Sequence, residues 1–208
     1  IGPDRQLLPL PDAGPLTDRV RGETLLAVPA IVALLAAAAE ALGFAHERGI
    51  VHRDIKPANL MRVGEGAVKI MDFGLAKSAA TSVTHDGALF GTPNYMSPEQ
   101  VRGDPLDGRS DLFSLGVVAY EMLTGGKPFS GDSISSVLYR IVHEPPQGEP
   151  LRLDRIAAPL AAFLGRALAK NRDARFPDGL AFSAALRRAG EAAASVAAAP
   201  ALAGRTPP

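Results

Sequence analysis

Apolar and polar positions along this chain predict a mainly helical protein with one short hairpin. Residues 29–48 are almost entirely apolar and rich in Ala and Leu, which favour helix, with Pro29 suited to the first turn and Gly49 to the end. Glu40 interrupts the apolar run, so we interpret the segment as a buried core helix rather than a membrane span.

A second long helix is predicted over residues 111–124, where apolar side chains occur on nearly every side. Ser110 or Asp111 can cap its start, and Gly125 can end it. A helix that is apolar on most faces belongs in the middle of a core. Three further helices are predicted, at about residues 133–143, 157–169 and 178–189.

Two short apolar runs between the long helices predict a β-hairpin. Leu60–Val63 and Ala67–Met71 flank the turn-forming triplet at residues 64–66, Gly-Glu-Gly. Residues 72–96 have little apolar periodicity and predict a long loop, and such a loop in a compact domain usually has a functional role.

The two ends of the chain carry weaker patterns. Residues 1–28 indicate irregular structure with one short helix around Pro15–Arg21. Residues 190–208 are rich in Ala and Pro and indicate a linker or disordered tail. We therefore expect one domain over residues 1–189.

Composition narrows the classes of function. The chain has 22 Lys and Arg against 22 Asp and Glu, so its charge gives no sign of a nucleic-acid partner or an anionic membrane. It has no Cys, which excludes disulfides and thiolate metal sites and fits a cytoplasmic location. His46, His85 and His143 are scattered, so we expect no zinc site.

Three short segments carry chemically useful groups. Residues 52–59 (HRDIKPAN) offer a carboxylate that can orient an attacking hydroxyl and accept its proton, and an amide whose oxygen can bind a divalent metal. Residues 71–74 (MDFG) offer a second carboxylate, suited to metal ions that bridge phosphates. Residues 91–99 (GTPNYMSPE) close the long loop. The three segments in this order are far more specific than any one alone.

From about residue 15 to 189 the chain resembles the bacterial eukaryotic-like serine/threonine protein kinases. Residues 107–116 (DGRSDLFSLG) and 170–176 (KNRDARF) extend the resemblance to the family's central helix and to the segment before its last helix. The resemblance implies the C-lobe of a protein kinase. This is a helical bundle around a buried central helix, with a small hairpin that carries the catalytic loop and the Asp-Phe-Gly turn.

The resemblance also implies a reaction, the Mg²⁺-dependent transfer of the γ-phosphoryl group of ATP to Ser or Thr hydroxyls of protein substrates. Asp54 would be the catalytic base, and Lys56 would neutralise the transferring group. A Lys at that place marks the serine/threonine class. Asn59 and Asp72 would bind Mg²⁺.

Two more residues around the reacting groups follow from the same resemblance. Thr92 would hydrogen-bond near Asp54 and Lys56 and help to select Ser or Thr. Met61 would lie under the adenine ring of ATP, although a plain core position in its strand explains this residue about as well.

The resemblance also implies regulation through Arg53, the residue directly before the catalytic base Asp54. Arg53 would pair with a phosphate on the loop and so order it. Thr81, Ser82 and Thr84 are the candidate acceptors, with Thr84 first by its distance from residues 91–92. Asp86 stands where related kinases often carry a second Thr. It would either partly mimic a phosphate or, as we expect, be an ordinary solvated loop residue.

Two structural contacts are implied as well. Glu99 and Arg175 would form a buried ion pair that ties the loop to the rest of the lobe. Asp111 would accept backbone hydrogen bonds from the catalytic loop.

The small N-terminal lobe of such a kinase has no counterpart in these residues. No G-x-G-x-x-G and no V-A-I-K-like Lys precedes His52, and the first Lys of the chain is Lys56. We therefore expect the parent to be an active kinase and this chain alone to be inert.

The alternative is an inert lobe that acts as a protein-binding or regulatory module. A parent that continues into a transmembrane span would make the chain the cytosolic part of a membrane-anchored kinase.

Overall fold

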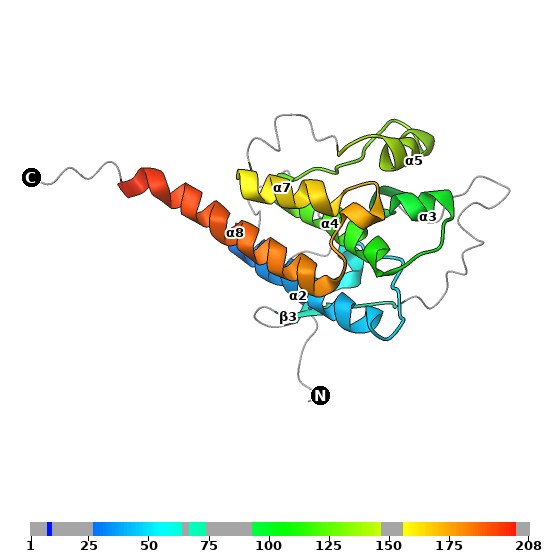
Figure 1. Cartoon of the computed structure of the whole chain (residues 1–208), viewed down its shortest axis with the longest axis horizontal. Coiled ribbons are helices and arrows are strands. Elements are labelled where there is room, and N and C mark those ends of the chain that lie inside the picture. Colours follow the sequence, from blue (N-terminus) through cyan, green and yellow to red (C-terminus); the bar gives the residue numbers. More distant parts are fainter. Residues whose placement is uncertain (1–7, 10–26, 64–66, 74–92, 147–155, 203–208) are drawn as a thin grey trace, which may run out of the picture.

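The computed structural model describes residues 8–9, 27–63, 67–73, 93–146 and 156–202, and most of these are helical, which confirms the predicted mainly α class (Figure 1). The helices are α2 (Val28–His46), α3 (Pro98–Arg102), α4 (Gly108–Thr124), α5 (Ile134–His143), α7 (Ala158–Ala167) and α8 (Gly179–Leu202). Three short 3₁₀ turns are η1 (Pro57–Asn59), η2 (Pro93–Tyr95) and η3 (Arg172–Ala174). The strands are β1 (Leu8–Pro9), β2 (Leu60–Val63) and β3 (Ala67–Ile70).

Helix α4 lies at the centre of the molecule and packs against α2 and α7 (Figure 1). Every residue from Ser110 to Met122 is buried, as the predicted all-round apolar pattern requires. The helix begins one turn before the predicted start, because the side chain of Asp107 caps it by accepting a hydrogen bond from Arg109 N. It ends as predicted at Gly125, whose φ of 77° suits glycine.

Helices α2 and α8 lie side by side along much of their length (Figure 1). Glycine permits this close approach, since a Cβ at Gly179 would lie 2.0 Å from the carbonyl oxygen of Ala39. By length and composition α2 would pass for a membrane span. More than half of its most apolar window is buried inside the protein, however, so its apolar side chains serve the core, as predicted.

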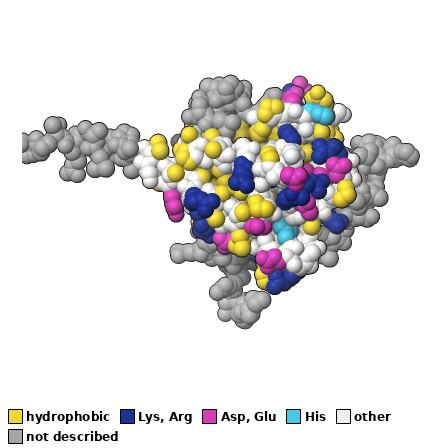
Figure 2. Space-filling view, in the orientation of Figure 1, with side chains coloured by type: hydrophobic (Ala, Val, Ile, Leu, Met, Phe, Trp, Pro, Cys, Tyr) yellow, Lys and Arg dark blue, Asp and Glu magenta, His cyan; other side chains and the backbone are white. Residues whose placement is uncertain are grey.

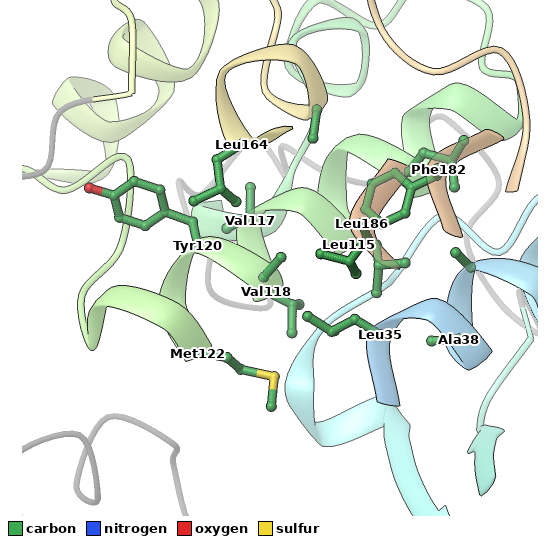
Figure 3. Packing of buried hydrophobic residues seen from close by; sticks show 14 of the residues in the cluster. Leu35, Ala38, Leu115, Val117, Val118, Tyr120, Met122, Leu164, Phe182 and Leu186 are labelled. Atoms are coloured by element: carbon green, nitrogen blue, oxygen red, sulfur yellow. The ribbon is translucent and has the colours of Figure 1, made fainter. Parts of the chain in front are cut away.

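The core forms where α2, α4, α7 and α8 meet. Figure 3 shows Leu35 of α2, Leu115 and Val118 of α4, and Phe182 and Leu186 of α8 pointing toward one another. Each of these side chains is fully buried. Removing most of one such side chain typically costs about 2–5 kcal/mol, so this cluster supplies much of the stability that holds the site in place.

The predicted hairpin is present as β2 and β3, which pair antiparallel with Leu60 opposite Ile70 and Val63 opposite Ala67. A third strand, β1, extends the sheet by pairing Leu8 with Arg62. The sequence pattern did not reveal β1, because two residues that include a proline give no alternation to detect. The turn at residues 64–66 and the short helix expected around Pro15–Arg21 lie outside the described residues.

The expected linker from residue 190 onward differs from the structure. Helix α8 continues from the predicted 178–189 segment to Leu202, so residues 190–202 are helical. Alanine has the highest helix propensity, and Ala193 is still buried in the extension, which explains why the helix does not stop at residue 189. Alanine-rich composition was therefore wrongly interpreted as irregular structure.

Acidic and basic side chains are mixed over the face of the molecule shown in Figure 2, in keeping with the balanced composition. One network of such charges lies at the start of α4. In it Asp107 contacts both Arg109 (2.8 Å) and Arg172 (3.3 Å), and Arg109 also contacts Asp173 (2.7 Å). The network joins the start of α4 to η3, which immediately precedes Arg175.

Candidate active site

The segment at residues 52–59 connects α2 to β2, and the buried ring of His52 holds it against the protein interior. Its Nε2 donates to the carbonyl oxygen of Met71 (2.8 Å), and its Nδ1 accepts from the backbone N–H of Asp54 (3.2 Å). The same ring meets the edge of Phe73, with the centroids 4.8 Å apart. One side chain therefore holds together two segments, 52–59 and 71–73, that the sequence analysis singled out separately.

Asp54, Lys56 and Asn59 converge at the end of this loop. Lys56 Nζ contacts Asp54 Oδ2 at 2.7 Å, and the two side chains are each 35% exposed. Asn59 Nδ2 donates to the carbonyl of Asp54 (2.8 Å) and to its Oδ2 (3.2 Å). A carboxylate that solvent can reach, next to a cation, is suited to meet a substrate hydroxyl.

Asp72 lies at the end of β3, next to this group. The backbone N–H of Met71 donates to the carbonyl oxygen of Asn59 (2.8 Å), which brings the end of the strand against η1. Because the amide nitrogen of Asn59 bonds to Asp54, its oxygen is the atom that can bind a metal. A carboxylate and an amide oxygen suit Mg²⁺, which keeps several waters or phosphate oxygens in its shell. The described residues contain no group of three His, Asp or Glu side chains that could hold a metal ion.

Strained backbone marks the same place. Among the described residues other than glycine, Arg53 (φ 69°) and Asp72 (φ 56°) are the ones with positive φ. The left-handed conformation costs roughly 1–2 kcal/mol for such residues and persists where surrounding contacts impose it. Arg53 directly precedes Asp54, and Asp72 itself has the second carboxylate that would carry the chemistry.

Asp111 of α4 imposes the conformation of the loop at Arg53. Its two oxygens accept hydrogen bonds from the backbone N–H groups of His52 (2.7 Å) and Arg53 (2.8 Å), the contacts that the family resemblance implies. The carboxylate also bonds to His46 Nε2 at the end of α2 (2.8 Å). No role for His46 follows from the sequence, because its partner lies 65 residues away and no spacing rule connects them.

Glu99 and Arg175 form the expected ion pair in the protein interior. Arg175 donates to both oxygens of Glu99, at 2.7 and 2.9 Å, and the side chains are 1% and 0% exposed. Ser110 Oγ also donates to Glu99 (2.7 Å). Burial alone raises the pKa of Glu99, but the hydrogen bonds and charge of Arg175, with help from Ser110, hold that pKa at about 2.

Met61 lies in β2, half-buried, opposite Lys69 on β3 and Pro9 on β1.

Several other predicted residues fall outside the described part of the chain, namely Gly74, Thr81, Ser82, Thr84, Asp86 and Thr92. Gln100 also reaches the catalytic loop, a contact that no sequence pattern predicts. Its side chain donates to the carbonyl of Arg53 (2.8 Å) from α3, a helix of five residues.

Comparisons with known proteins agree with this geometry. The family model described as "Protein kinase domain" matches residues 7–184. Serine/threonine-protein kinase PknB of Mycobacterium tuberculosis (strain ATCC 25618 / H37Rv) is 46% identical over 168 residues, which cover 79% of this chain and 27% of that protein. The PknB of Mycobacterium leprae is 47% identical over 167 residues, with the same coverage. Serine/threonine-protein kinase Pkn1 of Myxococcus xanthus is 41% identical over 182 residues, 85% of this chain and 26% of that protein. The chain spans about a quarter of the length of these relatives.

Proposed function

Since this chain belongs to the protein kinase domain family, with bacterial serine/threonine kinases among its relatives, we propose that it forms the C-terminal lobe of a serine/threonine kinase domain. The reaction proposed for the parent is transfer of the ATP γ-phosphoryl group to Ser or Thr hydroxyls of proteins. The observation that supports this most directly is the convergence of Asp54, Lys56 and Asn59 beside the strand end that carries Asp72.

Each of these side chains has a role in the proposed reaction. Asp54 orients the substrate hydroxyl and takes its proton as the new oxygen–phosphorus bond forms and the bond from the γ-phosphorus to the β,γ-bridging oxygen breaks. Lys56 carries the positive charge that offsets the charge of the transferring group. Asn59 and Asp72 are the residues that would hold Mg²⁺. The ion supplies charge neutralisation between the β- and γ-phosphates when it is bound.

Two further roles complete the proposed site. Thr92 selects Ser or Thr by hydrogen bonding near Asp54 and Lys56, and Met61 supports the adenine ring of ATP. The half-buried place of Met61 in β2 is compatible with a ligand above the sheet.

Regulation and support follow from the same proposal. A phosphate on Thr84, or on Thr81, pairs with the guanidinium of Arg53 and orders the loop. Asp111 supports the pairing of Arg53 with a phosphate because its carboxylate already fixes the backbone of Arg53. The buried pair of Glu99 and Arg175 anchors the far end of the loop.

We propose that the other half of the ATP site comes from a small lobe that these 208 residues do not encode, since neither the glycine-rich loop of a kinase nor the Lys of its V-A-I-K motif occurs in them. Without those groups the chain binds ATP poorly and transfers no phosphoryl group. We place the kinase domain in the cytosol, either free or attached to a membrane span elsewhere in the parent.

The test compares three proteins for Mg²⁺-ATP-dependent phosphorylation of a generic basic protein substrate. These are the chain alone, the chain fused to the small lobe of a bacterial relative, and that fusion with Asp54→Asn. We expect activity only in the fusion that retains Asp54, with a loss of about 10²–10⁴-fold in the variant. An inactive fusion that still folds and binds ATP would instead favour a protein-binding module.

A further inference from the structure

The side chain of Gln100 bonds to two distant segments at once. Its amide oxygen accepts a hydrogen bond from the backbone N–H of Ser97 (2.9 Å), and its amide nitrogen donates to the carbonyl of Arg53 (2.8 Å). The backbone N–H of Gln100 donates in turn to Ser97 Oγ (3.3 Å), which completes the capping box of α3. Gln100 thus connects the first turn of α3 to the loop that holds Asp54.

The chemistry of the two partners requires an amide at this position. A backbone N–H can only donate and a backbone carbonyl can only accept, so the orientation of the Gln100 amide is fixed by its neighbours. Glutamate would serve the capping box equally well, because that motif accepts either Glu or Gln. An ionised carboxylate, however, has no proton to offer the carbonyl of Arg53. The second contact is therefore the one that distinguishes Gln from Glu.

The carbonyl in question belongs to the strained residue directly before Asp54. Arg53 has a φ of 69°, and its N–H is held by Asp111 Oδ1 at 2.8 Å. The Gln100 amide holds the other side of the same residue. Because the carbonyl of Arg53 is part of the peptide that leads into Asp54, fixing its direction also fixes the direction from which the Asp54 side chain leaves the backbone.

We propose that Gln100 is a positioning residue for the phosphoryl-transfer reaction, coupling the folded state of the turn at residues 97–100 to the orientation of the peptide between Arg53 and Asp54. This inference rests on the proposed function of Asp54. The capping box directs the amide of Gln100 only when residues 97–100 adopt the first turn of α3. That turn directly follows residues 72–96, the segment expected to be the long loop, so its folding is communicated to the catalytic loop through one side chain.

The test uses two matched substitutions in the complete kinase, made by fusing the chain to the small lobe of a bacterial relative. Gln100→Glu keeps the capping box and removes the donor to Arg53. Ser97→Ala removes the hydroxyl half of the cap but keeps both bonds of the Gln100 side chain. Steady-state kinetics and melting temperatures are measured for both variants and for the parent.

We expect Gln100→Glu to lower kcat about tenfold, the effect of losing one hydrogen bond near 1.4 kcal/mol, with the KM for ATP and the melting temperature nearly unchanged. Ser97→Ala should lower the melting temperature by about 2–4 °C and leave kcat as in the parent. Gln100→Ala lacks both contacts and should show both a lower kcat and a lower melting temperature. If Gln100→Glu does not fold, the kcat of Gln100→Ala, measured below its melting temperature, tests the inference instead.

Two outcomes would overturn the inference. A Gln100→Glu variant with the kcat of the parent, or one whose loss of activity only follows its loss of stability, would reduce Gln100 to an ordinary cap. An inactive parent fusion that folds and binds ATP would overturn the proposed function and this inference together, whereas an active parent with an unaffected variant overturns the inference alone.

Discussion

Two carboxylate–cation pairs in this molecule have the same shortest N···O distance, but one pair is exposed to solvent and the other is buried. Asp54 and Lys56 approach to 2.7 Å with each side chain 35% exposed, and Glu99 and Arg175 approach to 2.7 Å with almost no exposure. An exposed pair contributes little to stability because water competes for both charges. A buried pair cannot lose one partner without leaving the other uncompensated. The N···O distance alone therefore does not distinguish a pair suited to catalysis from a pair that stabilises the fold, whereas burial does.

The largest effect that this comparison predicts is on stability. Glu99→Ala should lower the free energy of unfolding by about 3–5 kcal/mol, because the Arg175 guanidinium would remain buried without its carboxylate. The matched change in the exposed pair, Lys56→Ala, should cost less than about 1 kcal/mol. Urea unfolding of both variants gives the two values, and equal losses would break the comparison.

A smaller effect should appear on acidification. The pKa of Glu99 is held at about 2, against an ordinary value of 4.5, so the pair stabilises the fold fully above about pH 4.5 and its contribution is lost as the pH falls toward 2. The whole contribution is about 3 kcal/mol, of which roughly 2 should be lost between pH 6 and pH 3.

The measurement is the stability difference between the wild type and Glu99→Gln at several pH values. This subtraction removes the other acidic groups, including Asp107, whose pKa is also lowered to about 2 by its hydrogen bonds to Arg109. A difference that stays constant down to pH 3 would show that Glu99 does not titrate as its surroundings indicate.

The smallest predicted effect concerns strain at the exposed site. Asp72 has a φ of 56°, a conformation that glycine adopts freely, so Asp72→Gly should raise stability by about 0.5–1 kcal/mol while removing the metal-binding carboxylate. Asp72→Ala removes the same carboxylate without relieving the strain and is the control. Thermal unfolding of the two variants would contradict this account if alanine stabilised the protein as much as glycine.

The sequence predicted the parts of this molecule that depend on local pattern. The all-round apolar stretch of α4, the hairpin strands and the Gly125 end all follow from residues within a few positions of one another. The start of α4 was misplaced because three polar residues within five positions, Asp107, Ser110 and Asp111, can each cap a helix, and only packing decides which one does.

Contacts that join distant segments were predicted only where the family resemblance supplied them. The Glu99–Arg175 pair and the role of Asp111 came from that source. His46 and Gln100 were missed because His46 belongs to no motif and the S-x-x-Q pattern of residues 97–100 predicts only a local helix cap. Their partners lie 65 and 47 residues away. Side-chain geometry across such separations is set by tertiary structure, which spacing along a sequence does not encode.

The pairing of α2 with α8 has a consequence for how the protein is made. The side chain of Glu40 on α2 bonds to Ser183 on α8, and the two are 143 residues apart. During synthesis at about 5–20 residues per second, α2 would wait roughly 7–30 s before its partner leaves the ribosome. For that interval the face of α2 that α8 covers stays exposed, although α4 can pack against α2 as soon as it has been made, and closing so long a loop is slow even afterwards. We therefore expect chaperones that shield this face of α2 to raise the yield of the protein in cells.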